Sequence, residues 1–129
     1  DLFIVPPHYH KDDFHKETIC AERYRQKKGY KAFPGVFDTI GCKLLEPAPD
    51  TELIIMDELG FMEAEAEKFK SHVLQILNGI IPVLGVIKPM DIAFLNSVRY
   101  HENVLVEQID FDNRDVICKK IIKKYIDSK

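Results

Sequence analysis

The feature that most constrains the fold is an alternation of short apolar runs with amphipathic stretches, which begins near residue 52. Apolar runs occupy 53–56 and 80–87, and apolar side chains recur at helical spacing between them. This order is typical of βα units on a parallel sheet. Because strands of parallel sheets are normally covered on both faces, we expect 53–56 to lie between two layers of helices. The pattern predicts an α/β fold.

The other elements follow from the same kind of pattern. We expect helices at 16–26, 36–46, 63–78 and 91–98, with a last helix after residue 115, and short strands at 2–5 and 104–106. The chain has 129 residues, of which 46% are hydrophobic and 30% charged, as in a single globular domain. We therefore expect one domain over 1–129.

Composition disfavours several classes of partner. The longest apolar run is far shorter than the ~20 residues that span a bilayer, and no signal segment opens the chain, so we expect a cytoplasmic protein without a membrane partner. The net charge of -3 and the lack of a basic stripe argue against a nucleic-acid partner. Cys20, Cys42 and Cys118 form no C-x-x-C pair and are expected to be buried free thiols. The oligomeric state is left open.

Two carboxylates, Asp57 and Glu58, directly follow the apolar run 53–56. Charges at the end of a buried strand are costly unless a positive partner lies opposite them. Ligands of open α/β sheets bind at this edge, and hydrated Mg²⁺ needs only one or two carboxylates. Asp57 therefore suits the metal, and Glu58 suits the orientation or deprotonation of an attacking water. The alternative is an ordinary charged boundary between strand and loop.

A longer string strengthens the first interpretation. Residues 57–63 read D-E-L-G-F-M-E and resemble the D-E-[IL]-G-x-M-E stretch of the nucleoside-triphosphatase family first described from thermophiles, a branch of the P-loop NTPases. Segments 32–41, 66–69, 82–87 and 112–115 resemble further parts of that family, and the resemblance covers about 19–125. The resemblance implies Mg²⁺-dependent hydrolysis of nucleoside triphosphates to diphosphates, with loose base preference. It also implies a three-layer P-loop NTPase-like fold with a parallel sheet.

The resemblance also implies roles for single residues. Carried over by position, Asp57 belongs to the metal shell and Glu58 to the attacking water. Glu63 is a second candidate for the metal shell, although a carboxylate in the first turn of a helix also favours the helix dipole.

Two basic residues are weaker candidates for contact with the nucleotide. Arg114 begins the last expected helix and could contact the base or the phosphates; the alternative is a surface ion pair with Asp112 or Asp115. Lys88 follows the run 80–87 on the expected nucleotide side of the sheet, and its alternative is a solvated loop lysine.

The phosphate-binding motif of this superfamily is missing from the 129 residues. A P-loop needs G-x-x-x-x-G-K-[ST], whereas the earliest glycine here is Gly29, so Lys16 and Thr18 are no phosphate cradle. We expect a fold that lacks its N-terminal strand, P-loop and helix, with further residues preceding Asp1. Alternatively, residues 2–5 occupy the vacant place in a degenerate relative. The competing functions are a non-hydrolysing binding or regulatory module and a nucleotide or small-molecule kinase.

Two other clusters of side chains have possible functions. His8, His10 and His15 with two neighbouring aspartates could hold a metal, although solvated histidines in a polar loop are the simpler interpretation. Tyr24, Tyr30 and Phe33 stand among lysines and arginines and suggest a surface that stacks a nucleotide base or a single strand. The alternative for these aromatics is a helix end with lysine-rich flanks.

Overall fold

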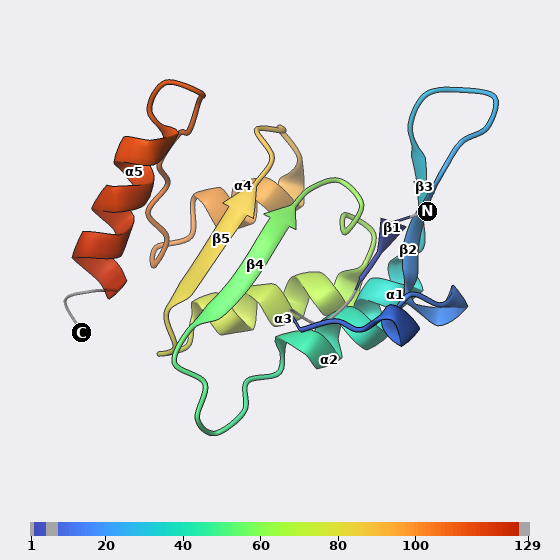
Figure 1. Cartoon of the computed structure of the whole chain (residues 1–129), viewed down its shortest axis with the longest axis horizontal. Coiled ribbons are helices and arrows are strands. Elements are labelled where there is room, and N and C mark those ends of the chain that lie inside the picture. Colours follow the sequence, from blue (N-terminus) through green and yellow to red (C-terminus); the bar gives the residue numbers. More distant parts are fainter. Residues whose placement is uncertain (1, 5–7, 127–129) are drawn as a thin grey trace.

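The computed structural model describes residues 2–4 and 8–126 of the chain. Its strands form two sheets (Figure 1). The first is antiparallel, in the order β1 (Leu2–Phe3), β2 (Ile19–Arg23) and β3 (Tyr30–Ala32). The second pairs β4 (Ile54–Leu59) with β5 (Val83–Ile87) in parallel. A parallel pair linked through a helix confirms the predicted α/β class.

Helices occupy most of the remaining chain. The α-helices are α1 (Pro34–Val36), α2 (Cys42–Leu45), α3 (Glu67–Leu77), α4 (Ala93–Arg99) and α5 (Arg114–Ile121). The short 3-10 helices are η1 (Lys11–Asp13) and η2 (Lys16–Thr18), and the short π-helices are η3 (Phe37–Gly41) and η4 (Ile122–Ile126). Within the described ranges, no helix is both long and apolar enough to cross a membrane.

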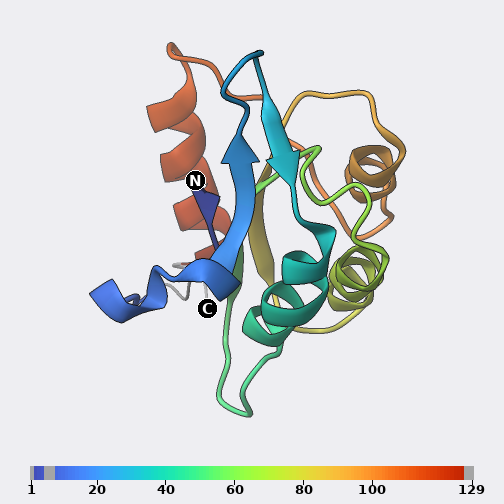
Figure 2. The same cartoon turned by 90° about the vertical axis from the view of Figure 1, so that its right-hand side faces the viewer.

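The core lies between one face of the parallel pair and the helices α3 and α4, which Figure 2 shows on the same side of β4 and β5. Alternate residues Ile54 and Met56 of β4 point into it and are buried, and Leu59, beyond the register shift that follows Met56, is buried as well. Val73 of α3 and Leu95 of α4 are fully buried against them. This packing fixes the direction of β4, and thereby the position of the two carboxylates at its end.

The other face of the parallel pair is open, contrary to the prediction of helices on both sides. Ile55 is 64% exposed and Val86 is 49% exposed. Because side chains alternate along a strand, these residues point away from the face that α3 and α4 cover. The apolar run 53–56 thus has one buried and one exposed face.

The helical segment 34–45 supports the start of α3. It agrees with the predicted helix 36–46. Gly41 allows the close approach, since a Cβ atom there would lie 3.0 Å from the ring of Phe69. The Asp38 carboxylate accepts a hydrogen bond from the Phe69 N–H at 2.9 Å, and so supplies the cap that Ala66, at the N-cap position, cannot provide.

Three predicted elements differ in the structure. The helix expected at 16–26 is the short turn η2 followed by strand β2, because β1 and β3 take up the backbone hydrogen bonds of 19–23. Residues 104–106 have no regular secondary structure and belong to neither sheet. Leu2–Phe3 does form a strand, but it pairs with β2 and does not occupy a place beside β4, while Val5 lies outside the described residues.

The cysteines are free, as predicted, but differ in burial. Cys20 is buried in β2, Cys42 is half-buried, and Cys118 is exposed on α5. The expectation of three buried thiols is therefore wrong for Cys42 and Cys118; Cys118 lies on α5, whose residues are mostly exposed.

Candidate functional site at the end of strand β4

Strand β4 ends in a β-bulge that contains both predicted carboxylates. Met56 pairs with Gly85 and Leu59 pairs with Ile87, so β4 uses one more residue than β5 over this interval. Glu58 has a φ of 60°, in the left-handed region that side chains other than glycine seldom adopt. Bulges of this kind redirect side chains and are frequent beside active sites. Asp57 and Glu58 are both exposed at the carboxyl edge of the pair.

Lys88 comes from the end of the neighbouring strand and faces Glu58. The Lys88 ammonium lies 3.6 Å from Oε1 of Glu58. The Lys88 N–H donates to the carbonyl of Leu59 at 2.9 Å, which continues the ladder beyond the bulge. Both side chains are partly exposed, so the pair adds little to stability. The pair instead holds the Lys88 ammonium and the Glu58 carboxylate close together at the ends of the two strands.

Glu63 closes the loop that follows the bulge. Its buried carboxylate accepts a hydrogen bond from the Gly60 N–H at 2.9 Å. Burial raises the pKa of the Glu63 carboxyl above its ordinary value, while hydrogen bonds from the N–H groups of Gly60 and of Glu63 itself oppose the rise. Glu58 raises the pKa further and Lys88 lowers it.

The prediction that Glu63 begins a helix is therefore wrong. Residues 62–65 form turns, and α3 starts only at Glu67. Sequence reasoning missed the bond between Glu63 and Gly60, although their spacing of three residues is that of a capping box.

The chain is similar to known proteins over most of its length. A family model described as NTPase matches residues 11–122. The chain belongs to this NTPase family. Similar proteins are the nucleoside-triphosphatase THEP1 of Thermotoga petrophila, 33% identical over 66% of this chain and 48% of the relative, and that of Thermotoga maritima, 29% identical over 81% and 60%. That of Methanosarcina barkeri is 34% identical over 68% of this chain and 50% of the relative.

The chain spans about half the length of the curated relatives that it matches. No solved structure gives a significant match to it. The thermophile-type NTPase family inferred from the motif at 57–63 is thus confirmed.

The remaining candidates belong to elements other than β4 and β5. Arg114 starts α5, and its guanidinium carbon lies 6.0 Å from the centre of the Phe111 ring. The predicted ion pair of Arg114 with Asp112 or Asp115 is not formed in the described part of the chain. Over residues 2–4 and 8–126, no group of three histidine, cysteine or acidic side chains is placed to hold a metal ion, so the histidines near the N-terminus do not converge on one.

The strained backbone at Glu58 leads to a stability prediction. Glu58→Gly is expected to be more stable than Glu58→Ala by about 1 kcal/mol, because only glycine adopts the left-handed region without a steric penalty. Both variants lose the contact with Lys88, so their comparison isolates the backbone. Urea unfolding measures the difference.

Asp57 offers a matched control for this comparison. Among the described residues other than glycine, only Glu58 has a positive φ, so Asp57→Gly should be less stable than Asp57→Ala. Equal stability of the two Glu58 variants would contradict the strained conformation.

Proposed function

We propose that the protein hydrolyses nucleoside triphosphates to diphosphates in a Mg²⁺-dependent reaction at the bulge of β4. The observation that carries the proposal is the placement of Asp57 and Glu58, both exposed, at the carboxyl edge of a parallel pair, with Lys88 beside Glu58. Ligands of α/β sheets bind at this edge. Membership of the NTPase family supports the same chemistry. A loose preference for the base follows from the family resemblance.

The side chains at the bulge fit a hydrated Mg²⁺ ion. They offer one or two carboxylates, which is what this ion takes from a protein when waters and phosphate oxygens fill its other positions. Asp57 would hold the ion, through a water, and Glu63 is a weaker candidate because its carboxylate is buried and bonded to Gly60. When bound, Mg²⁺ would neutralise charge on the phosphates.

Glu58 would act on the attacking water. As the water oxygen bonds to the γ-phosphorus, the bond from that phosphorus to the bridging oxygen breaks, and Glu58 accepts the water proton. Lys88 positions the Glu58 carboxylate and could also contact the phosphates. Arg114 remains a proposed contact to the nucleotide, from α5.

We also propose that residues 1–129 form one α/β domain that is part of a three-layer, P-loop NTPase-like arrangement. The exposed apolar face of the parallel pair, with Ile55 and Val86, supports this, because such a face normally packs against another layer.

A non-hydrolysing nucleotide-binding or regulatory module is the second candidate. Such a module would keep the α/β scaffold and bind the nucleotide without hydrolysing it. Phosphate release separates the two functions. The protein expressed from its complete gene should release phosphate from ATP or GTP when Mg²⁺ is present. Binding of either nucleotide without phosphate release would support the second candidate instead.

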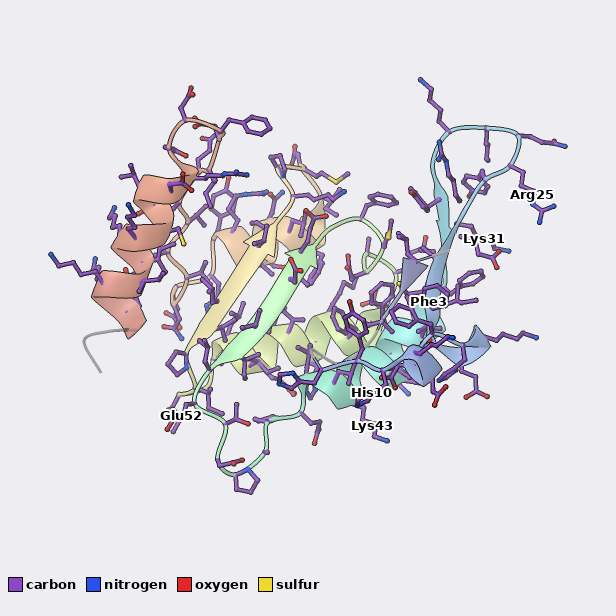
Figure 3. All side chains as sticks on the ribbon, in the orientation of Figure 1. Phe3, His10, Arg25, Lys31, Lys43 and Glu52 are labelled. Atoms are coloured by element: carbon purple, nitrogen blue, oxygen red, sulfur yellow. The ribbon has the colours of Figure 1, made fainter. Side chains whose placement is uncertain are left out.

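Asp57→Asn tests the metal assignment. The Mg²⁺ concentration for half-maximal phosphate release should rise roughly 10- to 100-fold, because a neutral amide holds the water of a hydrated cation less strongly. Glu52→Gln is the matched control, since Glu52 is an exposed carboxylate just before β4, at the opposite end of the strand (Figure 3). An unchanged Mg²⁺ requirement in Asp57→Asn would remove Asp57 from the metal shell.

A further inference from the structure

A cleft of about 330 Å³ separates the β2–β3 hairpin from the loop that follows β4. Three aromatic rings and a methionine contribute to its walls. The hairpin side includes Tyr24, Tyr30 and Lys31, and the loop side includes Phe61, Met62 and Glu65. This volume lies at the small end of the range for small-molecule sites, which are mostly apolar with a few polar groups.

The hairpin holds one aromatic wall in place. The Tyr24 N–H donates to the Gly29 carbonyl at 3.0 Å, and Gly29 turns the chain with a φ of 105°. The Lys27 ammonium lies 4.2 Å from the centre of the Tyr24 ring, yet Lys27 does not line the cleft. The alternative interpretation of these aromatics as a helix end is therefore wrong, because the segment is a basic β-hairpin. Of the three residues predicted to stack a base, Tyr24 and Tyr30 line the cleft and Phe33 does not.

The cleft adjoins the bulge and is bordered by positive charge. Phe61, the first loop residue of the cleft lining, follows Glu58 by three positions, so its Cα lies within about 11 Å of the Cα of the proposed catalytic residue. The hairpin carries five exposed cations and one acidic side chain; they are Arg23, Arg25, Lys27, Lys28 and Lys31, with Glu22. Figure 3 shows Arg25 and Lys31 on this hairpin. Such a rim attracts an anionic ligand.

We infer that this cleft binds the nucleobase of the nucleoside triphosphate, with the phosphates directed toward the bulge. The inference rests on the proposed function. A planar ring stacks on aromatic side chains whatever its identity, so such a cleft would give the loose base preference proposed above. Lys31 and Glu65 can meet the polar edge of the base. The cleft suits a single nucleoside, whereas a nucleic-acid strand needs a groove for several bases.

Phe61→Ala tests the inference. Phe61 is 38% exposed, so its removal leaves the core intact. The value of kcat/KM for ATP and for GTP should fall about 5- to 100-fold, mainly through KM, because one stacking partner is lost. Hydrolysis of inorganic tripolyphosphate, which has no base, should change less than twofold. Phe61→Tyr should restore the activity toward ATP, since it keeps the ring.

Tyr100→Ala is the matched control. Tyr100 is 77% exposed at the end of α4 and does not line the cleft. Its loss should therefore leave the activity toward ATP, GTP and tripolyphosphate unchanged. Equal losses for ATP and tripolyphosphate in Phe61→Ala would overturn the inference. Tighter binding of a single-stranded oligonucleotide than of ATP, lost in Phe61→Ala, would replace it with a nucleic-acid site.

If the protein does not hydrolyse nucleoside triphosphates, these measurements give a different result. In that case neither ATP nor tripolyphosphate is hydrolysed, and the cleft is tested by binding alone. Phe61→Ala should then weaken the binding of ATP but not of tripolyphosphate, and equal binding of ATP by the variant and the natural protein would overturn the nucleobase site.

Discussion

Glu58→Gln is expected to reduce phosphate release from ATP and GTP about 100- to 10,000-fold, the usual contribution of a general base. Glutamine keeps the length and shape of the side chain but does not accept the water proton at neutral pH. Nucleotide binding should persist, because Asp57 and the aromatic cleft are unchanged. The loss should therefore appear in kcat, measured in single-turnover reactions with the protein expressed from its complete gene.

Glu52→Gln serves as the control for this measurement too. It removes one exposed carboxylate just before β4, at the end of the strand remote from the bulge, and should retain full activity. Activity of Glu58→Gln within threefold of the natural protein would exclude Glu58 as the base. Loss of nucleotide binding together with activity would assign Glu58 to binding rather than to proton transfer.

Glu63→Ala is expected to lower the free energy of unfolding by about 1–3 kcal/mol, the cost of leaving a buried N–H without an acceptor. The N–H concerned belongs to Gly60, which is itself buried. The variant also removes most of a buried side chain. Urea unfolding gives the change. Glu65→Ala is the control, because Glu65 is an exposed carboxylate of the same loop and should change stability by less than about 0.5 kcal/mol.

Glu63→Gln separates the hydrogen bond from the charge, since the amide oxygen can still accept from Gly60. Burial raises the pKa of Glu63 above its ordinary value of 4.5, so the folded protein binds this proton more tightly than the unfolded chain. Protonated Glu63 therefore stabilises the folded protein at low pH. This contribution to the free energy of unfolding is lost as the pH rises from about 4.5 through the raised pKa. Relative to Glu63→Gln, the natural protein should lose stability over this interval. A pH-independent difference would contradict a buried, titrating carboxyl.

Sequence periodicity determined the elements around the proposed site. The run 53–56, the amphipathic stretch before residue 78 and the run that ends at Ile87 appear as β4, α3 and β5, and α4 lies where 91–98 was expected. Their patterns arise from burial against one another within a short stretch of chain. The motif at 57–63 likewise determined the family, because it consists of contiguous residues.

Only the tertiary structure decided how the N-terminal residues pair and where the side chains of the site lie. Residues 19–23 form a strand through partners at either side, and local propensity does not report such partners. The positive φ of Glu58, its contact with Lys88 and the cleft between Tyr30 and Phe61 all depend on the register of β4 with β5 or on the position of the hairpin. These features join residues about 30 positions apart, and backbone hydrogen bonds and packing between distant segments bring them together.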